Sequence, residues 1–346
     1  MGFLTNLPLI LGAIFAFGLI VFAHELGHFL TALYHKIPVE EFSMGMGPLL
    51  WHRDSKGIRY SLRLFPIGAF VRLVGDEDSS DGAAKEDYHS IPVGRRMAMT
   101  FAGPLFNFVL AVVLFSTIGI FSGVISEQPR IGAVRPEGIA YHAGLLEGDT
   151  FLSINGVPIS TWSEAVRSIN ASPEQELVIV VSRGGQETEI LATPERSDGD
   201  GLGRIGISAV VERFDFVNSI RHGFMQTGEA IGLFYYTIFG SIITREAPEL
   251  IGVVGIIQVT GQVAQAGFAN LMWFMGFISI NLGVVNLLPV PPLDGARLLL
   301  MTIEKVRGKP MNPEREGVLH MVGYFCLISL IVLVTFGDIW RIIGPR

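Results

Sequence analysis

Three long stretches of this chain contain no charged residue, and this feature limits the folds open to it more than any other. They cover residues 1–23, 97–126 and 269–293, and a shorter apolar stretch covers 320–337. A helix needs about 20 consecutive apolar residues to cross a bilayer. Charged residues make up only 16% of the chain, against about a quarter in water-soluble domains. The sequence therefore predicts a multi-pass α-helical membrane protein with about four transmembrane helices.

A signal peptide is the alternative interpretation of the first stretch. It has no basic residue near its start and no small-residue cleavage site, and both are expected of a signal peptide. We therefore interpret it as a retained span. The single cysteine, Cys326, excludes an intrachain disulfide and a cysteine-rich metal site.

Polar segments between the apolar stretches indicate further domains. Residues 58–64 alternate apolar and polar side chains, which is the period of a half-buried strand. RDSKG before them is typical of a turn, so this region is predicted to form a membrane-associated β-hairpin. Residues 214–268 are amphipathic at first and apolar later. They are expected to form interfacial helices, with a dip into the membrane as the alternative.

AGLLEGDTFLSINGVPI, at residues 143–159, resembles the PDZ family, in which such a run packs a short helix onto a strand and turn. PDZ domains bind extended chain ends by adding a strand to the edge of a sheet. The resemblance implies one inserted α/β domain that binds a peptide. A purely structural cap on the membrane domain is the alternative.

The predicted order of domains follows from these segments. It is transmembrane helix 1 over 1–34, the hairpin and loop over 35–96, transmembrane helix 2 over 97–124, the PDZ-like domain over 125–213, interfacial helices over 214–268, transmembrane helix 3 over 269–295, a cytoplasmic loop over 296–318 and transmembrane helix 4 over 319–340.

Basic residues are distributed unevenly between the polar segments. Nine Lys or Arg residues lie in 36–96 and four in 305–315, while none precedes Lys36. Cytoplasmic loops of membrane proteins are enriched in Lys and Arg. The distribution therefore predicts the hairpin inside the cell, with the N-terminus and the PDZ-like domain outside the cytoplasm.

The strongest chemical signal is HELGH at residues 24–28, late in the first apolar stretch. On a helix, His24 and His28 share one face and can bind one metal ion, with Glu25 beside them as a base. Such residues are costly in hydrocarbon, so their presence at this spacing indicates a zinc site. The alternative is two histidines that are satisfied by neighbouring polar groups.

A catalytic zinc site needs a third protein ligand and an open position for water. The end of the third apolar stretch offers Asn281, Asn286 and Asp294, and only Asp294 is a strong anionic ligand. A plain turn at Asp294–Gly295 is the alternative. If Asp294 is the third ligand, residues 214–268 must cross the membrane an even number of times. We predict that they do not cross it at all. A single crossing would leave Asp294 on the order of 20 Å from the histidines.

The motifs together resemble the site-2 protease family of intramembrane zinc metalloproteases. HELGH, AGPLFN at 102–107, the PDZ-like insert and NLLPVPPLDG at 286–295 occur in the order of that family. The resemblance covers nearly the whole chain, and it is closest to bacterial members of the regulator of sigma-E protease type.

The resemblance implies a metalloendopeptidase that cuts transmembrane segments of single-pass membrane proteins. It implies one Zn²⁺ per chain, bound by His24, His28 and Asp294, with Glu25 as the catalytic base. Asn281 and Asn286 are expected to help hold the substrate or the site. Asn107 in the second span is expected near the site, as a further candidate for substrate binding, because it falls in the motif of that family.

From the residues themselves we expect the hairpin over Ile58–Leu73 to offer an edge that binds the unwound substrate as an added strand. Tyr60 and Leu62 are the candidate substrate-binding residues on it, and a structural plug is the alternative.

The expected location is the bacterial inner membrane, with the active site towards the cytoplasmic side. Expected partners are the lipid bilayer and single-pass substrates such as an anti-sigma factor or a remnant signal peptide, some of them cut beforehand by another protease. The PDZ-like domain is expected to bind an extended peptide or to act as a size filter, and no nucleic acid is expected. The rival function is a non-catalytic PDZ-containing membrane adaptor or chaperone, which the intact Glu25 argues against.

Overall fold

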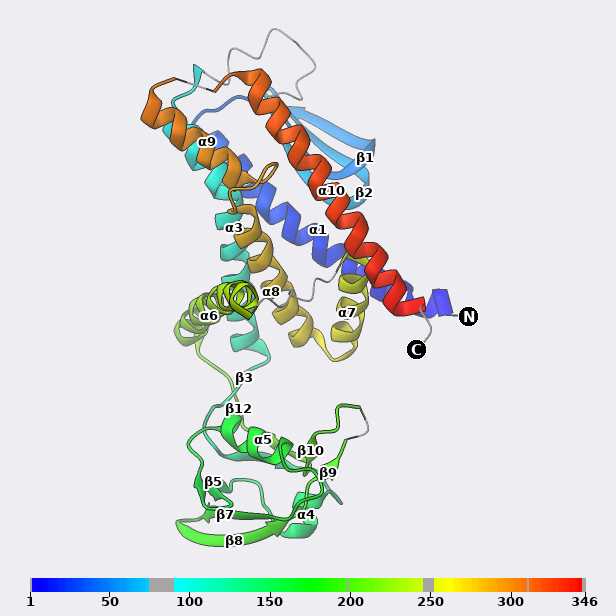
Figure 1. Cartoon of the computed structure of the whole chain (residues 1–346), viewed down its shortest axis with the longest axis vertical. Helices are drawn as coiled ribbons and strands as arrows, with labels where there is room; N and C mark the ends of the chain where they lie inside the picture. Colours follow the sequence, from blue (N-terminus) through cyan, green and yellow to red (C-terminus); the bar gives the residue numbers. More distant parts are fainter. Residues whose placement is uncertain (1, 75–89, 198, 245–251, 310, 344–346) are drawn as a thin grey trace. The chain divides into compact units, whose positions relative to one another are not determined.

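The computed structural model describes residues 2–74, 90–197, 199–244, 252–309 and 311–343. The chain divides into two compact units (Figure 1). The membrane unit comprises residues 1–118 and 219–346, and the PDZ-like unit comprises residues 119–218. Residues 75–89 of the predicted hairpin and loop, and 245–251 of the predicted interfacial segment, lie outside the described residues.

Four helices of the membrane unit are, among the described residues, long and apolar enough to cross a membrane. They are α1 (Gly2–Tyr34), α3 (Val93–Phe121), α8 (Phe268–Asn286) and α10 (Pro313–Ile343). Each is built mostly from one of the apolar stretches, because a helix satisfies every backbone polar group internally and is the form such a stretch takes in lipid. The number agrees with the about four spans predicted from the sequence.

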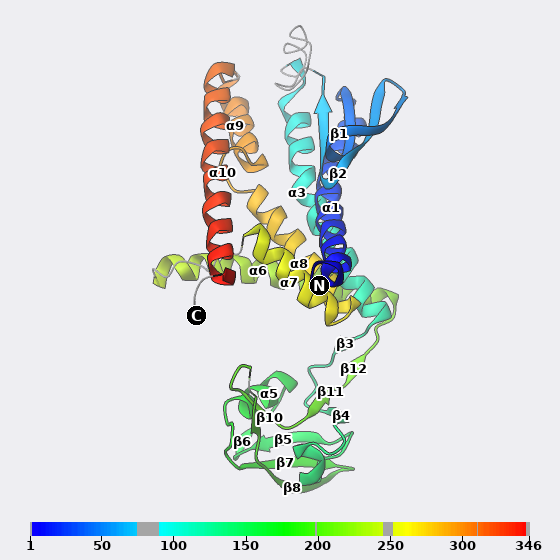
Figure 2. The ribbon, with the colours of Figure 1, turned by 90° about the vertical axis from the view of Figure 1, so that its right-hand side faces the viewer.

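The predicted interfacial segment forms α6 (Phe216–Thr244) and α7 (Val253–Gln265). Neither helix meets the length and hydropathy of a span among the described residues. Figure 2 shows α6 running across the direction of α3, α8 and α10. Large apolar side chains of α6 are exposed, including Phe224, Tyr236 and Phe239. These features fit a helix that lies along a membrane surface.

The third span is shorter than the sequence predicted. The predicted helix over 269–295 includes Asp294, whereas α8 ends at Asn286. Asp294 instead begins a separate helix, α9 (Asp294–Arg307), which also replaces much of the predicted loop over 296–318. The segment between the helices contains three prolines. Proline has no backbone N–H and cannot continue a helix, so the chain turns there.

The predicted hairpin is formed by β1 (Val39–Ser55) and β2 (Ile58–Leu73), which bend so that each strand pairs twice. Phe42, for example, pairs with both Tyr60 and Val71. The pairing gives four segments in the order 49–55, 58–63, 41–44 and 69–73. The first and last of these are therefore the edges of a small sheet, and 58–63 lies inside it.

A buried carboxylate holds this bend together. Glu41 is 3% exposed and accepts hydrogen bonds from Ser61 at 2.5 Å, Arg63 at 2.8 Å and Arg72 at 3.2 Å. A buried charge is tolerated when it is paired and fully hydrogen-bonded. The three donors come from both pairing segments of β2, so they link the segments on either side of Glu41.

The PDZ-like unit has its own hydrophobic core, which includes Phe151, Trp162 and Ile179. Its main sheet has the order β6-β5-β7-β8. Thr161 and Glu164 cap α5 reciprocally, which is the capping-box signal for a helix start. Its elements are β3 (Val124–Ile125), β4 (Ile131–Val134), α4 (Ile139–Ala143), β5 (Thr150–Ile154), β6 (Val157–Pro158), α5 (Trp162–Asn170), β7 (Leu177–Arg183), β8 (Gln186–Ala192), β9 (Glu195–Arg196), β10 (Gly203–Arg204), β11 (Ile207–Ala209) and β12 (Val211–Glu212).

Candidate active site

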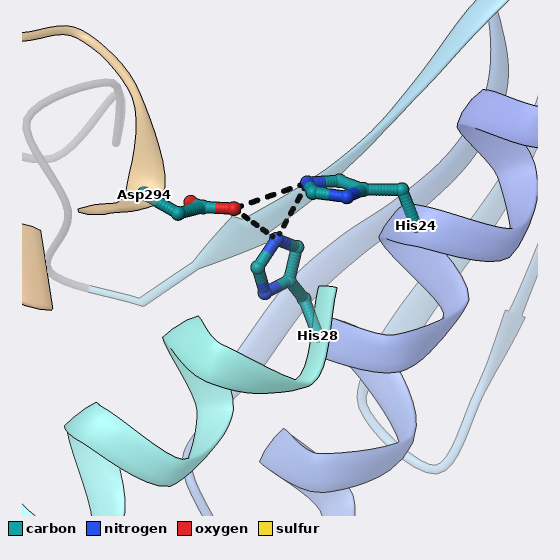
Figure 3. Close-up of side chains that lie close together, drawn as sticks. All are labelled: His24, His28 and Asp294. Atoms are coloured by element: carbon teal, nitrogen blue, oxygen red, sulfur yellow. Dashed lines mark hydrogen bonds and ion pairs between the residues drawn. The ribbon is translucent and has the colours of Figure 1, made fainter. Parts of the chain in front are cut away.

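Two histidines of α1 and the first residue of α9 point towards one another (Figure 3). Nε2 of His24 lies 3.1 Å from Oδ2 of Asp294, and Nε2 of His28 lies 3.4 Å from the same oxygen. The two Nε2 atoms are 3.1 Å apart. Within the described part of the chain, these three residues are the group whose side chains could hold a metal ion together. Asp294 therefore lies at the depth of the histidines.

The donor set fits a zinc ion. Tetrahedral zinc holds nitrogen and oxygen ligands at about 2.0–2.2 Å, which puts neighbouring ligand atoms on the order of 3.3 Å apart. The three atoms of this cluster have separations of 3.1, 3.1 and 3.4 Å. Oδ2 of Asp294 is buried and has no hydrogen-bond donor. A cation among the three atoms would satisfy that oxygen.

The backbone of α3 orients His28. Nδ1 of His28 donates to the carbonyl of Met99 at 2.9 Å. A neutral imidazole with its proton on Nδ1 has a free lone pair on Nε2, which is the atom that faces Asp294. Metal-ligating histidines generally have such an outer partner, which fixes the ring and its tautomer.

Asn107 of α3 plays the corresponding part for His24. Its side chain is fully buried, and its Nδ2 lies 3.1 Å from Nδ1 of His24. Oδ1 of Asn107 is buried without a partner. Turning the amide by half a rotation brings that oxygen to Nδ1 as an acceptor, and Nε2 of His24 is then free to bind a metal. Asn107 was expected to help hold the substrate or the site, and its position favours the second role.

Gly103 of α3 makes room for both imidazoles. A Cβ atom at this position would collide with Nε2 of His28 and press on Cε1 of His24. The small residue of AGPLFN therefore lets α3 pass directly behind the two histidines. Small residues allow this close approach of helices in membranes.

Glu25 lies beside the cluster on α1 and is half-buried. It interacts electrostatically with His28, His24 and Asp294, and with the backbone N–H of Val71. Val71 belongs to the edge segment 69–73 of the hairpin sheet. A carboxylate next to three candidate metal ligands can accept a proton from a water molecule in the site, and the edge segment 69–73 runs beside it.

The model of peptidase family M50 matches residues 12–330 of this chain. The chain belongs to peptidase family M50. This M50 peptidase is 33% identical to the zinc metalloprotease RasP of Geobacillus kaustophilus, over 97% of this chain and 99% of the relative. It is 31% identical to the regulator of sigma-W protease RasP of Bacillus subtilis, over 96% and 98%. The predicted membership of the site-2 protease family and the zinc metalloprotease class are thereby confirmed.

These alignments run over 422 and 417 positions, more than the 346 residues of this M50 peptidase, so the two relatives carry segments that it lacks. Among solved structures, the PDZ domain of an SdrC-like protein from Listeria monocytogenes matches 25% of this chain and 92% of its own length. The identity is 20% and the TM-score is 0.23.

Two residues predicted to contact substrate lie inside the hairpin sheet of the M50 peptidase. Tyr60 pairs with Phe42 and Arg53, and Leu62 pairs with Met44 and Trp51. Their backbone groups are therefore engaged on both sides and cannot accept an added strand. The edge that the sequence predicted over Ile58–Leu73 is therefore not offered by the Ile58–Leu62 part, because the strands bend and fold over it, whereas segment 69–73 of the same range does lie at an edge.

The two asparagines of α8 are both half-buried. Nδ2 of Asn281 donates to the carbonyl of Phe277 in its own helix at 2.8 Å. Asn286 is the last residue of α8 and precedes the proline-rich turn that leads to Asp294. Their expected role in holding the substrate or the site stays a prediction.

The sequence did not reveal the part that the start of α3 plays in the site. α3 begins at Val93 and not at 97, so it includes Arg96. Arg96, Met99, Gly103 and Asn107 follow one another at intervals of three or four residues, which puts them on one face of the helix. With the helix start at Val93, this spacing predicts from the sequence that the four residues face the same side.

Substitution of Gly103 by Ala is expected to weaken zinc binding by about 10-fold or more, in the range caused by disturbing outer partners of metal ligands. The added methyl group must displace one of the two imidazoles. Competition of the purified protein with a graded series of chelators measures the affinity. Gly94→Ala is the matched control, because a Cβ there meets nothing within 4 Å. Equal affinities of the two variants would refute this account of Gly103.

Proposed function

We propose that this M50 peptidase hydrolyses peptide bonds within transmembrane segments of single-pass membrane proteins. One zinc ion per chain is held by His24, His28 and Asp294. The observation that carries the proposal is this three-residue cluster, which joins α1 to α9 in a unit rich in membrane-length helices. Ionisable residues inside a membrane are costly and mark functional sites.

The residues around the cluster divide the chemistry between them. When bound, zinc supplies a Lewis acid that polarises the scissile carbonyl and acidifies a water molecule near neutral pH. Glu25 takes the proton of the attacking water and passes it to the leaving nitrogen. Met99 and Asn107 keep the two histidines in the tautomer that leaves Nε2 free. The site is reached by water through a polar path from the cytoplasmic side.

A transmembrane substrate must unwind before it is cut, because its carbonyls are engaged in helical hydrogen bonds. The edge segment 69–73 supports an extended conformation of the unwound part. Its outer side is free of pairing within β1 and β2, and Val71 lies next to Glu25. An extended substrate that adds to this edge as a strand has its scissile bond beside the base.

Ester replacements in a synthetic substrate test this mode of binding. In an added strand, every second residue turns its N–H towards the neighbouring strand. Replacing single amides near the cleavage site by esters is therefore expected to reduce kcat/KM at alternate positions. Each loss is about 3- to 10-fold, the value of one hydrogen bond. The intervening positions are the built-in controls, and uniform losses along the substrate would contradict strand addition.

Mapping of the cleavage site tests the function itself. The full-length protein is reconstituted with zinc into liposomes that contain a tagged single-pass substrate, and the products are identified by mass spectrometry. We expect cuts within the apolar segment that disappear on addition of a zinc chelator. Cuts confined to the water-exposed flanks would indicate a zinc protease that acts at the membrane surface. If the zinc-loaded protein cuts nothing, the result would favour the adaptor function.

The PDZ-like unit offers a groove of about 310 Å³ for a peptide, bordered by α5 and residues 203–207. Trp162, Val166 and Ile169 line it from α5, and Arg135 also lines it. Apolar side chains opposite a short strand segment suit a peptide that is bound in extended form. We therefore prefer peptide binding to a role as a passive size filter.

The substitution Val166→Asp in the groove is expected to distinguish peptide binding by the PDZ-like unit from size exclusion by it. Val166 is half-buried in the groove, so a bound peptide would cover the new charge, and this cost lowers the affinity for the peptide. The size of the PDZ-like unit does not change. Cleavage of a substrate with an intact outer domain is compared with that of a pre-trimmed one. If the unit binds peptide, Val166→Asp changes this selectivity as deletion of residues 127–210 does. If it is a filter, the deletion alone changes it, and unchanged selectivity in both variants would contradict either role.

The charge distribution and the relatives support a proposal for the cellular setting. We place the protein in the bacterial inner membrane, with the N-terminus and the PDZ-like unit outside the cytoplasm and the metal site towards it. The Bacillus subtilis relative is named as a regulator of sigma-W protease. An anti-sigma factor or a remnant signal peptide, in some cases cut beforehand by another protease, is accordingly the substrate class we propose.

A further inference from the structure

A buried ion pair joins α3 to α9 away from the metal ligands. Arg96 is 2% exposed, and its Nη2 donates to Oε1 of Glu304 at 2.5 Å. Its Nε also donates to the carbonyl of Ile91 at 3.1 Å. Glu304 follows Asp294 by ten residues, which is about 15 Å along the helix axis. Glu304 is therefore too far along α9 to touch the metal or the reacting bond, and the guanidinium of Arg96 is held beside Glu304.

The pair is suited to fix the position of α9. Apolar contacts are non-directional, whereas a charge-assisted hydrogen bond from a guanidinium has a defined geometry. Near the start of α9, Gly295 lies so close to the carbonyls of Leu287 and Leu288 that a Cβ atom would collide with them. Contacts near both ends of α9 thus define its rotation and its position along its axis.

Arg96 also shares its part of α3 with the support of His28. Met99 follows Arg96 by three residues, which is about 4.5 Å along the helix axis, and its carbonyl accepts the bond from Nδ1 of His28. The same turn of α3 therefore contacts both parts of the metal centre. It holds His28 of α1 through the carbonyl of Met99, and it holds α9, which carries Asp294, through the bond from Arg96 to Glu304. The two ligands come from segments about 270 residues apart.

We infer that Arg96 and Glu304 are positioning residues of the metal centre, which set where Asp294 meets His24 and His28. The inference rests on the proposed zinc site. A buried ion pair often adds little net stability, so its main effect here is on geometry. Loss of outer partners of a metal site changes affinity or activity by about 10- to 100-fold, and we expect the same range for loss of this pair.

Cobalt substitution of the full-length protein tests the inference, because the visible spectrum of Co²⁺ reports ligand number and geometry. The rate of zinc release to a chelator is the second readout. Glu304→Leu is expected to change the cobalt spectrum and to speed zinc release by about 10-fold or more. Glu304→Gln retains an oxygen acceptor for Arg96 and is expected to keep both close to those of the wild type.

Two further variants separate positioning from folding. The double variant Arg96→Met/Glu304→Leu replaces the ion pair by apolar side chains, an exchange that proteins often tolerate without loss of stability. We expect it to fold and still to show the altered spectrum and the faster zinc release. Lys305→Met, at an exposed neighbour on α9, is expected to match the wild type.

The possible failures are distinguishable. A wild-type spectrum and release rate in both Glu304→Leu and the double variant would overturn the inference while leaving the zinc site intact. Equal changes in Lys305→Met would also overturn it, because they would show a general sensitivity of α9. If the wild-type protein binds neither cobalt nor zinc, the proposed function fails instead.

Discussion

Replacement of Glu25 by Gln is expected to leave zinc binding intact and to slow peptide hydrolysis by about 10²- to 10⁴-fold, the usual contribution of a general base. Glutamine has nearly the shape of glutamate but cannot accept the proton of the attacking water. The site otherwise keeps its three proposed ligand atoms, since the cluster of His24, His28 and Asp294 does not include Glu25. The substitution should therefore slow the hydrolysis step itself and leave metal binding unchanged.

Single-turnover cleavage of the reconstituted substrate, with metal analysis of the same preparation, measures this effect. Glu314→Gln is a suitable control, because Glu314 is an exposed glutamate at the start of α10. A Glu25→Gln protein that cleaves at the wild-type rate would exclude Glu25 as the base. Loss of zinc together with activity would instead assign Glu25 a role in holding the metal.

Replacement of Asp294 by Ala is expected to remove zinc from the protein. Two imidazoles at adjacent turns of α1 make an incomplete site, whereas a catalytic zinc site has three protein ligands. The loss in affinity should exceed the about 100-fold that marks the upper range for outer partners. Activity should disappear with the metal.

Zinc per chain in the purified wild type, compared with Asp294→Ala and His24→Ala, tests this ligand set. About one zinc in the wild type and none in either variant is the expected result for a three-ligand site. Asp200→Ala serves as the control, because Asp200 is exposed in the PDZ-like unit. Retention of zinc in Asp294→Ala alone would require a different third ligand.

The local features of this protein could be predicted from the sequence. Uncharged stretches of about 20 residues have one stable form in a bilayer, so α1, α3, α8 and α10 follow from composition. His24 and His28 share a face because helix geometry fixes the direction of residues four apart. The run at 143–159 likewise identified the PDZ-like unit, since its turn and helix signals are local.

Contacts between distant segments were decided by the tertiary structure. The sequence made Asp294 a candidate ligand, but the approach of α9 to α1 depends on the proline-rich turn after α8 and on the contact of Glu304 with Arg96 of α3. The strand order of the hairpin, which puts Tyr60 between two paired segments and leaves Val71 at an edge, depends on how β1 and β2 bend. Register and helix packing arise from many weak contacts across the whole unit, and no short sequence pattern specifies them.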